Sequence, residues 1–496
     1  MKKSLIALAA LAATSAFAQS SVTLYGIVEV GADIGYNRTV DTSTSTRFTA
    51  TNGLAVGNST VLNALSMSQT TGGILFGPNT AAGGAAAGIN GGTVVLRQEQ
   101  KNGMRIQDGN DQGSGTSRVG FRGTEDLGGG LKANFMLEMG IRVDDGCVTT
   151  GAGNVCSSGN SGGNLFGRNA WGGISGGFGE VRVGRQVLGS FGVQANSWSA
   201  GSSNGLYDAA SGNLPMGGVR FSNAIRYLTP RMSGFGGSIM LAAPETEGFS
   251  STSQTSTPIN TGVGVITSTG AARRTGVDLA LDYSNGPAYI GFGYNVQDAA
   301  NTGSSFATTN AAAGVGVSSG FTPGKVTAWT LGGSYNFGVV RPFINYTRQN
   351  TQTDRTDSFT PVAGGFGANI RNNNEVNAHA WSVGLRAPVG AVTVIAGYGR
   401  LVASGLNNVV ATQNNAIQGN TTAHRISNEQ RRNSFQLGAQ YALSKRTSLQ
   451  ANYGYSRLQN DTTAVSTNNF LAASGVQTVS ASDRISALNV GLKHSF

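Results

Sequence analysis

Apolar and polar residues alternate strictly over long stretches of the chain, and such alternation predicts β-strands with one apolar and one polar face. In residues 22–36, Val22, Leu24 and Val28 share one face, whereas Thr23 and Glu29 lie on the other. The C-terminal residues 484–496 repeat the pattern up to the terminal Phe496. Both ends of the chain are therefore expected to be strands.

About sixteen such runs occur, and many approach the 9–11 residues that a tilted strand needs to cross a bilayer. In the first half of the chain the predicted strands are 22–36, 116–125, 131–142, 167–175, 179–186, 218–228, 234–243 and 272–284. In the second half they are 287–297, 325–337, 339–349, 375–388, 390–401, 432–443, 446–457 and 484–496.

The connections between these strands alternate between short and long. Short turns are expected at 126–130, 175–179, 284–287, 338 and 443–445. Long polar connections are expected at 38–115, 143–166, 187–217, 244–271, 298–324, 350–374, 402–431 and 458–483. Transmembrane barrels have this asymmetry, with short periplasmic turns and long extracellular loops.

A secreted soluble β-solenoid or sandwich is the alternative, because such folds can also be rich in Gly, Ser and Asn. Soluble folds have no reason to place Tyr and Trp at strand ends on the apolar face. Tyr227, Trp329, Tyr441 and Phe496 have that placement, as in the aromatic girdles of membrane barrels. The pattern therefore predicts an all-β fold, a 16-stranded antiparallel transmembrane β-barrel.

Composition narrows the classes of function. Of 496 residues, 75 are Gly and only 12% are charged, with a net charge of +10. Lys and Arg form no basic cluster of the kind that nucleic-acid binding requires, so nucleic acid is not an expected partner. After the N-terminal segment, no window of about 20 apolar residues predicts a transmembrane helix.

The first 18 residues have the features of a signal peptide. Lys2 and Lys3 precede the apolar run Leu5–Ala13, and Ala16-Phe17-Ala18 is a small-x-small cleavage site. Residues 1–18 are thus expected to be removed on export. Residues 19–496 then form one barrel domain.

Cys147 and Cys156 lie in a stretch rich in Gly, Ser and Asn. In an oxidising compartment this pair predicts a disulfide that closes a loop tip, with a reduced pair as the alternative. A metal site needs further ligands nearby, and the histidines are distant in sequence, so no metal is expected.

Enzymatic function is not expected either. A catalytic site would need a histidine oriented by an acid or a serine, and His379, His424 and His494 form no credible triad. The glycines form no strand–GxxxxGK–helix unit for nucleotide binding. No cofactor is predicted.

Several segments resemble the trimeric general porins of β-proteobacteria, and they span the mature chain in order. The matching segments are 21–26, 117–133, 166–171, 178–186, 220–227 and the C-terminus ending at Phe496. The resemblance implies a homotrimer in the outer membrane, surrounded by lipid and lipopolysaccharide. Assembly machinery is expected to recognise Phe496. The implied function is passive diffusion of small hydrophilic solutes and ions through a water-filled channel.

In this family the third long loop folds inward and narrows the pore against basic wall residues. The corresponding loop here spans about 187–217, and Asp208 is its single charge. The resemblance places Arg118, Arg168 and Arg220 at the constriction, with Arg182 and Arg185 as neighbours, and implies weak anion selectivity. The alternative for each arginine is an ion pair in the wall or at a turn.

Two other functions are weighed. A substrate-specific channel would show a ladder of arginines or stacked aromatic residues along the lumen, and none is evident. A barrel-anchored surface adhesin finds its support in the long 38–115 connection. Solute flux would separate these possibilities, because an adhesin anchor passes nothing.

Overall fold

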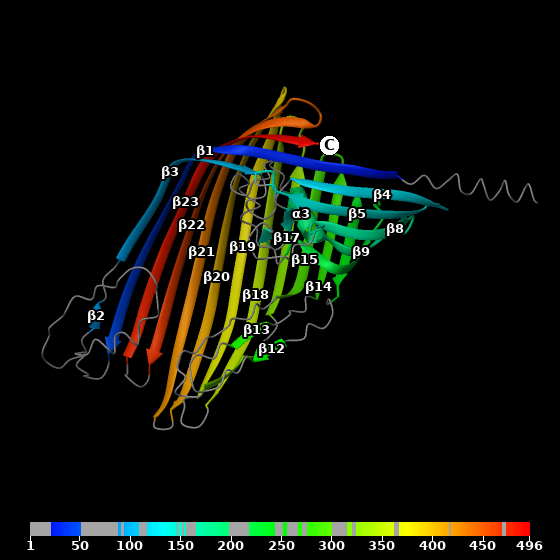
Figure 1. Cartoon of the computed structure of the whole chain (residues 1–496). Coiled ribbons are helices and arrows are strands. Elements are labelled where there is room, and N and C mark those ends of the chain that lie inside the picture. Colours follow the sequence, from blue (N-terminus) through cyan, green and yellow to red (C-terminus); the bar gives the residue numbers. More distant parts are fainter. Residues whose placement is uncertain are drawn as a thin grey trace, which may run out of the picture.

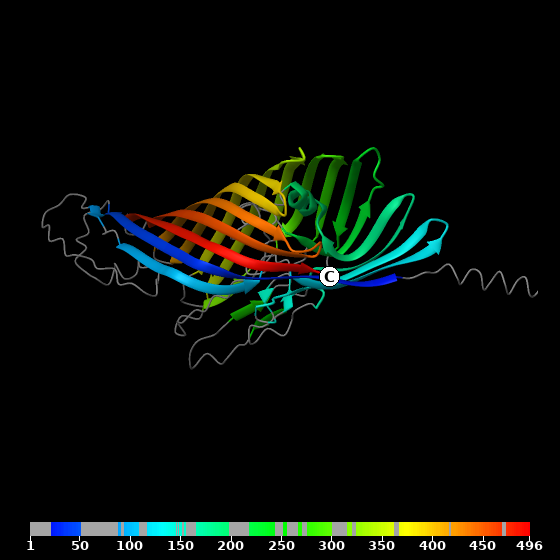
Figure 2. The ribbon, with the colours of Figure 1, turned by 90° about the horizontal axis from the view of Figure 1, so that it is seen from above.

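A computed structural model of the chain is a closed antiparallel barrel of 16 strands (Figures 1 and 2). Figure 2 shows the sheet curving around, with long strands on one side and shorter strands on the other. The structure describes residues 21–50, 88–90, 94–108, 117–144, 146, 148–150, 153–154, 165–197, 218–243, 251–254, 266–269, 275–299, 315–319, 324–361, 367–415, 418–468 and 473–496.

Each predicted strand corresponds to one wall strand, and every neighbouring pair is antiparallel. The first eight are β1 (Ser21–Ala50), β4 (Arg118–Gly128), β5 (Leu131–Ile141), β8 (Asn169–Gly176), β9 (Gly179–Val187), β10 (Arg220–Leu228), β11 (Phe235–Ala242) and β14 (Gly276–Asn285). The others are β15 (Ala288–Ala299), β17 (Gly324–Tyr335), β18 (Arg341–Pro361), β19 (Gly367–Val389), β20 (Val392–Asn415), β21 (Gln418–Ala442), β22 (Thr447–Asn468) and β23 (Ala473–Ser495).

The wall has an apolar outer face and a polar inner face. Ile225 and Leu281 point outward and are more than half exposed, at 56% and 52%. Asn295, Asn345 and Gln436 lie on the opposite face of their strands and are fully buried. A soluble protein buries apolar side chains and exposes polar ones, so this reversed arrangement suits a barrel whose outer face meets lipid.

Tight turns join the strands at one end of the barrel, called the turn end here; the opposite end is the loop end. β14 and β15 are connected by Gly286-Pro287, where Gly286 has φ 56°. A type II′ hairpin turn requires this positive φ at its first central residue, which glycine adopts without strain. The turn also matches the short connection predicted at 284–287.

The barrel closes by pairing its first strand with its last. β1 and β23 pair from Ile27 opposite Ser495 onward, and the C-terminal residue continues this closure. The backbone N–H of Phe496 donates to the carbonyl of Gly26, and the N–H of Gly26 donates to the carbonyl of Phe496, each at 3.1 Å. A Cβ at Gly26 would overlap the Phe496 ring, so the ring is seated where residue 26 has no side chain.

The predicted long connections in the second half of the barrel are mostly wrong. β18 to β23 and β1 have 21 to 30 residues each, so strand covers most of 350–374, 402–431 and 458–483 (Figure 1). These segments carry Ser, Thr and Asn on both faces, which removes the alternation that predicts a strand. Threonine nonetheless favours strands, and each backbone finds hydrogen-bond partners in the neighbouring hairpin arm.

The predicted 38–115 loop is also wrong in part, because β1 continues to Ala50 and β3 (Val94–Asp108) pairs with it. β4 then pairs with the first residues of the same β1 edge. The remaining short strands are β2 (Gly88–Asn90), β6 (Val148–Thr150), β7 (Gly153–Asn154), β12 (Ser251–Gln254), β13 (Ile266–Thr269) and β16 (Val315–Ser319). Among the residues described, no helix is long and apolar enough to cross a membrane.

Candidate pore constriction

The segment that follows β9 begins with a helix inside the barrel. This helix, α3 (Gly189–Ser197), corresponds to the first part of the predicted third loop. It lies against the inner face of β14, β15 and β17. Leu188, Phe221, Ala224 and Met240 form a small buried apolar cluster where the helix begins, so this end of the loop is packed against the wall.

Asp278 of β14 fixes the N-terminus of α3. Its carboxylate accepts hydrogen bonds from the backbone N–H of Gly189 at 2.7 Å and of Ser190 at 3.2 Å, and from the Ser190 hydroxyl. Asp278 is fully buried. An acidic side chain at this position caps free N–H groups and complements the positive end of the helix dipole. The cap therefore comes from a wall strand, not from the helix's own chain segment.

The C-terminal end of α3 is also tied to the wall. The side-chain amide of Asn345 on β18 donates to the hydroxyl of Ser197, and that hydroxyl donates to the carbonyl of Val193 at 2.8 Å. The helix sits this close because glycines face it from the wall. A Cβ at Gly293 would lie 2.6 Å from the Cα of Ser190, and one at Gly332 would overlap the Ser197 side chain.

Four of the predicted arginines gather at the loop-end limits of the short strands β4, β8, β9 and β10, around Glu138 of β5. The Nε atoms of Arg168 and Arg118 lie 2.8 Å and 3.7 Å from Glu138 oxygens, and the Tyr25 hydroxyl donates to the same carboxylate at 2.9 Å. The charges of Arg168, Arg185, Arg118 and Glu138 all act on Arg220. We call these four arginines and Glu138 the arginine cluster.

The arginine cluster holds four guanidinium groups and one carboxylate, so its net charge is positive. Arg185 is held by further bonds, to the Gly167 carbonyl at 2.7 Å and the Ser222 hydroxyl at 2.6 Å. Arg118 and Arg168 do form ion pairs with Glu138 in the barrel wall, which was the alternative interpretation of these residues. One carboxylate does not neutralise four neighbouring cations, and the cluster can therefore attract anions.

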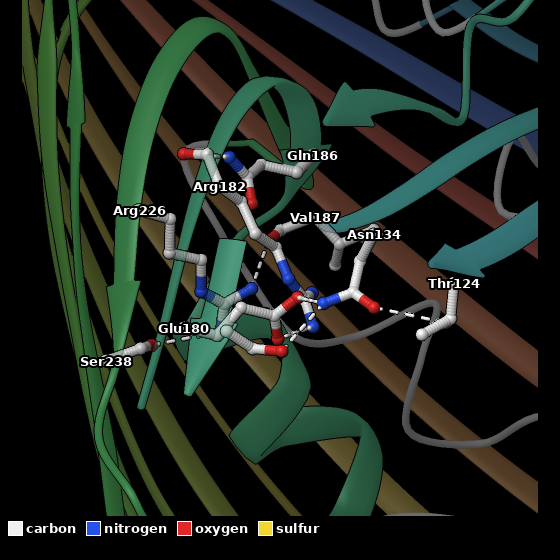
Figure 3. Close-up of polar contacts among 9 residues, drawn as sticks. Thr124, Asn134, Glu180, Arg182, Gln186, Val187, Arg226 and Ser238 are labelled. Carbon is white, nitrogen blue, oxygen red and sulfur yellow. Dashed lines mark hydrogen bonds and ion pairs between the residues drawn. The ribbon is translucent and has the colours of Figure 1, made fainter. Parts of the chain in front are cut away.

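Arg182 belongs to a separate network nearer the turn end (Figure 3). It pairs with Glu180 at 2.6 Å, and its guanidinium lies 4.1 Å from the centroid of the Trp171 ring. Asn134 donates to Glu180 at 3.3 Å and accepts from Thr124 at 3.1 Å. Because its charge is matched by Glu180, Arg182 does not join the arginine cluster.

Some predicted site residues lie outside the described residues. These are Asp208, the cysteines Cys147 and Cys156, and the signal peptide 1–18. Within the part of the chain that the structure describes, no three His, Cys, Asp or Glu side chains converge on a possible metal site.

Sequence reasoning did not single out Glu138 or the anchoring role of Asp278. Glu138 lies at an inward position in a predicted strand, and this placement was the available signal. Asp278 also lies at an inward position in a predicted strand, but its bond to residue 189 joins segments that are 89 positions apart. No local pattern indicates such a contact.

The chain was compared with known proteins. A family model described as Gram-negative porin matches residues 4–461. The chain belongs to the Gram-negative porin family. Outer membrane porin protein 32 of Delftia acidovorans is 30% identical to this porin over 504 aligned positions, which cover 100% of both chains. An outer membrane porin protein of Bordetella pertussis is 28% identical, over 92% of this chain and 94% of its own.

A solved structure described as an anion-selective porin from Comamonas acidovorans covers 96% of this porin and 100% of its own chain, at 22% identity and a TM-score of 0.43. Family and relatives place this porin in the outer membrane as a channel for passive diffusion. Porins are channels and not enzymes. A barrel of 16 strands encloses an aqueous lumen, whereas a barrel of about eight strands is filled by its side chains.

Proposed function

We propose that this porin is a general diffusion channel with a weak preference for small anions, set by the arginine cluster. The observation that carries the proposal is the gathering of Arg118, Arg168, Arg185 and Arg220 around the single carboxylate of Glu138. Fixed positive charge along a water-filled path raises the local concentration of anions. Water and salt screen it, so the preference is weak.

Unspecific diffusion is supported by the inner wall of β18 to β23. Its partly exposed side chains include Gln349, Arg386 and Gln440, and glycines lie between them. Such a wall offers hydrogen bonds to any hydrophilic solute and, within the described part of the chain, no stacked aromatic surface for a particular one. The structure thus favours a size filter over a substrate-specific site.

Solute flux into liposomes tests general diffusion. We expect uptake of neutral sugars through the reconstituted porin to fall steadily with sugar size and to rise in proportion to sugar concentration. Saturation by one sugar at low concentration would contradict general diffusion and favour a specific channel. Absence of any flux would favour the role of an anchored surface adhesin.

We further propose a homotrimer, which the family resemblance of the sequence implies. Folded protein is expected to migrate on a gel as a trimer before heating and as a monomer after it. A monomeric mass in mild detergent would contradict this assembly.

We propose that Phe496 is a signal for barrel assembly, separate from its packing on Gly26. Deleting Phe496 should sharply deplete the porin from the outer membrane, because the terminal aromatic residue is lost. Gly26→Val keeps Phe496 but fills the space in which its ring packs, and such overpacking costs about 1–3 kcal/mol. This control should still reach the membrane and unfold at a lower temperature. Quantitative blots of outer-membrane fractions distinguish the two, and equal depletion would contradict a separate signal.

A further inference from the structure

Outward-facing aromatic residues form two rows on the barrel. Near the turn end, Phe235 packs on Tyr283 and Tyr335 packs on Phe337, with ring centroids 4.8 Å and 4.6 Å apart. Farther toward the loop end, two more pairs contact each other at 5.2 Å and 5.4 Å, namely Trp329 with Tyr346 and Trp381 with Tyr398. Aromatic girdles mark the two membrane–water interfaces of a barrel. The second row therefore lies at the headgroups of the outer leaflet.

At the level of this second row, each of four strands carries an aromatic residue and, two positions farther toward the loop end, a basic one. The pairs are Tyr346 and Arg348 on β18, Trp381 and His379 on β19, Tyr398 and Arg400 on β20, and Tyr455 and Arg457 on β22. Arg348 lies directly opposite Trp329, and Arg400 lies opposite Trp381. Residues two apart on a strand share a face, so these basic side chains also point outward. All four are exposed. We call Arg348, His379, Arg400 and Arg457 the basic band.

The strand register brings the members of the basic band close together in two pairs, with Arg400 two positions nearer the turn end than the partner of His379. Arg348 lies opposite His379, and Arg400 lies opposite Asn433, which in turn lies opposite Arg457. The hydroxyl of Tyr398 donates to the side-chain carbonyl of Asn433 at 3.0 Å. The backbones at Arg400 and Arg457 are two strand spacings apart, a distance of about 10 Å. The long side chains of both arginines can reach one group placed over Asn433.

Among the described residues, the arginines of the basic band have no protein partners, unlike basic residues nearby. Within the described residues, Arg348, Arg400 and Arg457 make no ion pair or hydrogen bond. On the adjoining wall, Arg431 pairs with Glu429 at 2.6 Å and Arg484 pairs with Asp41. Three arginines at the headgroup level are thus available to an anion from the membrane.

We propose that the basic band binds the phosphate groups of a phosphorylated glycolipid in the outer leaflet. Guanidinium groups bind phosphate oxygens in a bidentate manner, and the band adjoins the apolar face that holds the acyl chains. A second barrel packed on this sector would bury unpaired arginines at a large desolvation cost, so lipid is the occupant. The site is local, because β11, β14 and β15 contain no Lys or Arg.

This site is tested by titrating the folded full-length porin in detergent with bisphosphorylated lipid A. Binding is measured by tryptophan fluorescence and by lipid adducts in native mass spectra. Arg400→Gln with Arg457→Gln should weaken binding about thirtyfold, given the attraction of each arginine to an anionic surface. Dephosphorylated lipid A should bind the wild type and this variant equally weakly. The charge-preserving pair Arg400→Lys with Arg457→Lys should retain intermediate affinity.

Lys445→Gln with Arg446→Gln is the matched control, because it removes the same charge at the turn between β21 and β22. This control should bind bisphosphorylated lipid A like the wild type. Heat-modifiable gel mobility shows that each variant is folded. Wild-type affinity in the Arg400 and Arg457 glutamine variant would overturn the proposal, as would an equal loss in the control. Displacement of the lipid by millimolar inorganic phosphate would also overturn it, since the site would then take free phosphate.

Discussion

Replacing Arg118 and Arg220 together by serine is expected to shift the ion preference of the porin from anions toward cations. The arginine cluster would keep Arg168 and Arg185 against the carboxylate of Glu138, so most of its excess positive charge is lost. The lumen should also widen, because two long side chains are removed. The zero-current potential across a KCl gradient in a planar bilayer measures the first effect, and single-channel conductance measures the second.

The charge-preserving variant, Arg118→Lys with Arg220→Lys, is the matched control. It should keep the sign of the wild-type potential, since the fixed charge is unchanged although the hydrogen-bonding geometry differs. A wild-type potential in the serine variant would place the selectivity outside the arginine cluster, in the loop-end connections.

Asp278→Ala is expected to loosen α3 from the wall and to make the channel current unstable. The substitution removes the acceptor for two backbone N–H groups and the Ser190 hydroxyl. Losing a helix cap of this kind costs about 1–2 kcal/mol. The loss weakens the packing of α3 on the wall, whereas the strands around it stay paired. Single-channel records should show frequent steps between conductance levels, and the folded barrel should keep its gel mobility.

Asp282→Ala controls for the loss of one carboxylate from the same strand. Asp282 lies nearer the turn end, where it pairs with Arg231 and makes no contact with α3 among the described residues. This variant should give steady currents. Equally unstable records from both variants would mean that charge in the lumen, and not the cap on α3, controls the current.

The strands could be predicted from the sequence because lipid on one side and water on the other require apolar and polar residues to alternate with a period of two. The predicted segments 131–142 and 179–186 differ from β5 and β9 by one residue at most at either end. The extensions of β1 and of β18 to β23 could not be predicted in this way. Above the membrane both faces of these strands meet water, so residues such as Thr42 to Thr46 carry no apolar alternation.

The constriction was only partly predictable, for a related reason. Family resemblance indicated Arg118 and Arg220, and the structure brings them together with Arg168 and Arg185. Parity gives the face of a strand but not the height of a partner on another strand. The bond of Asp278 to α3 and the separation of Arg182 from the arginine cluster therefore appear only when strand register is known.

The zero-current potential of the wild-type porin, measured across a KCl gradient at low and at high salt, tests the central claim most directly. The account predicts a potential of the anion-selective sign in dilute electrolyte. This potential should shrink toward that of free diffusion near 1 M salt, where the Debye length falls to about 3 Å. A cation-selective potential, or a preference that salt does not weaken, would contradict a water-filled channel governed by the arginine cluster.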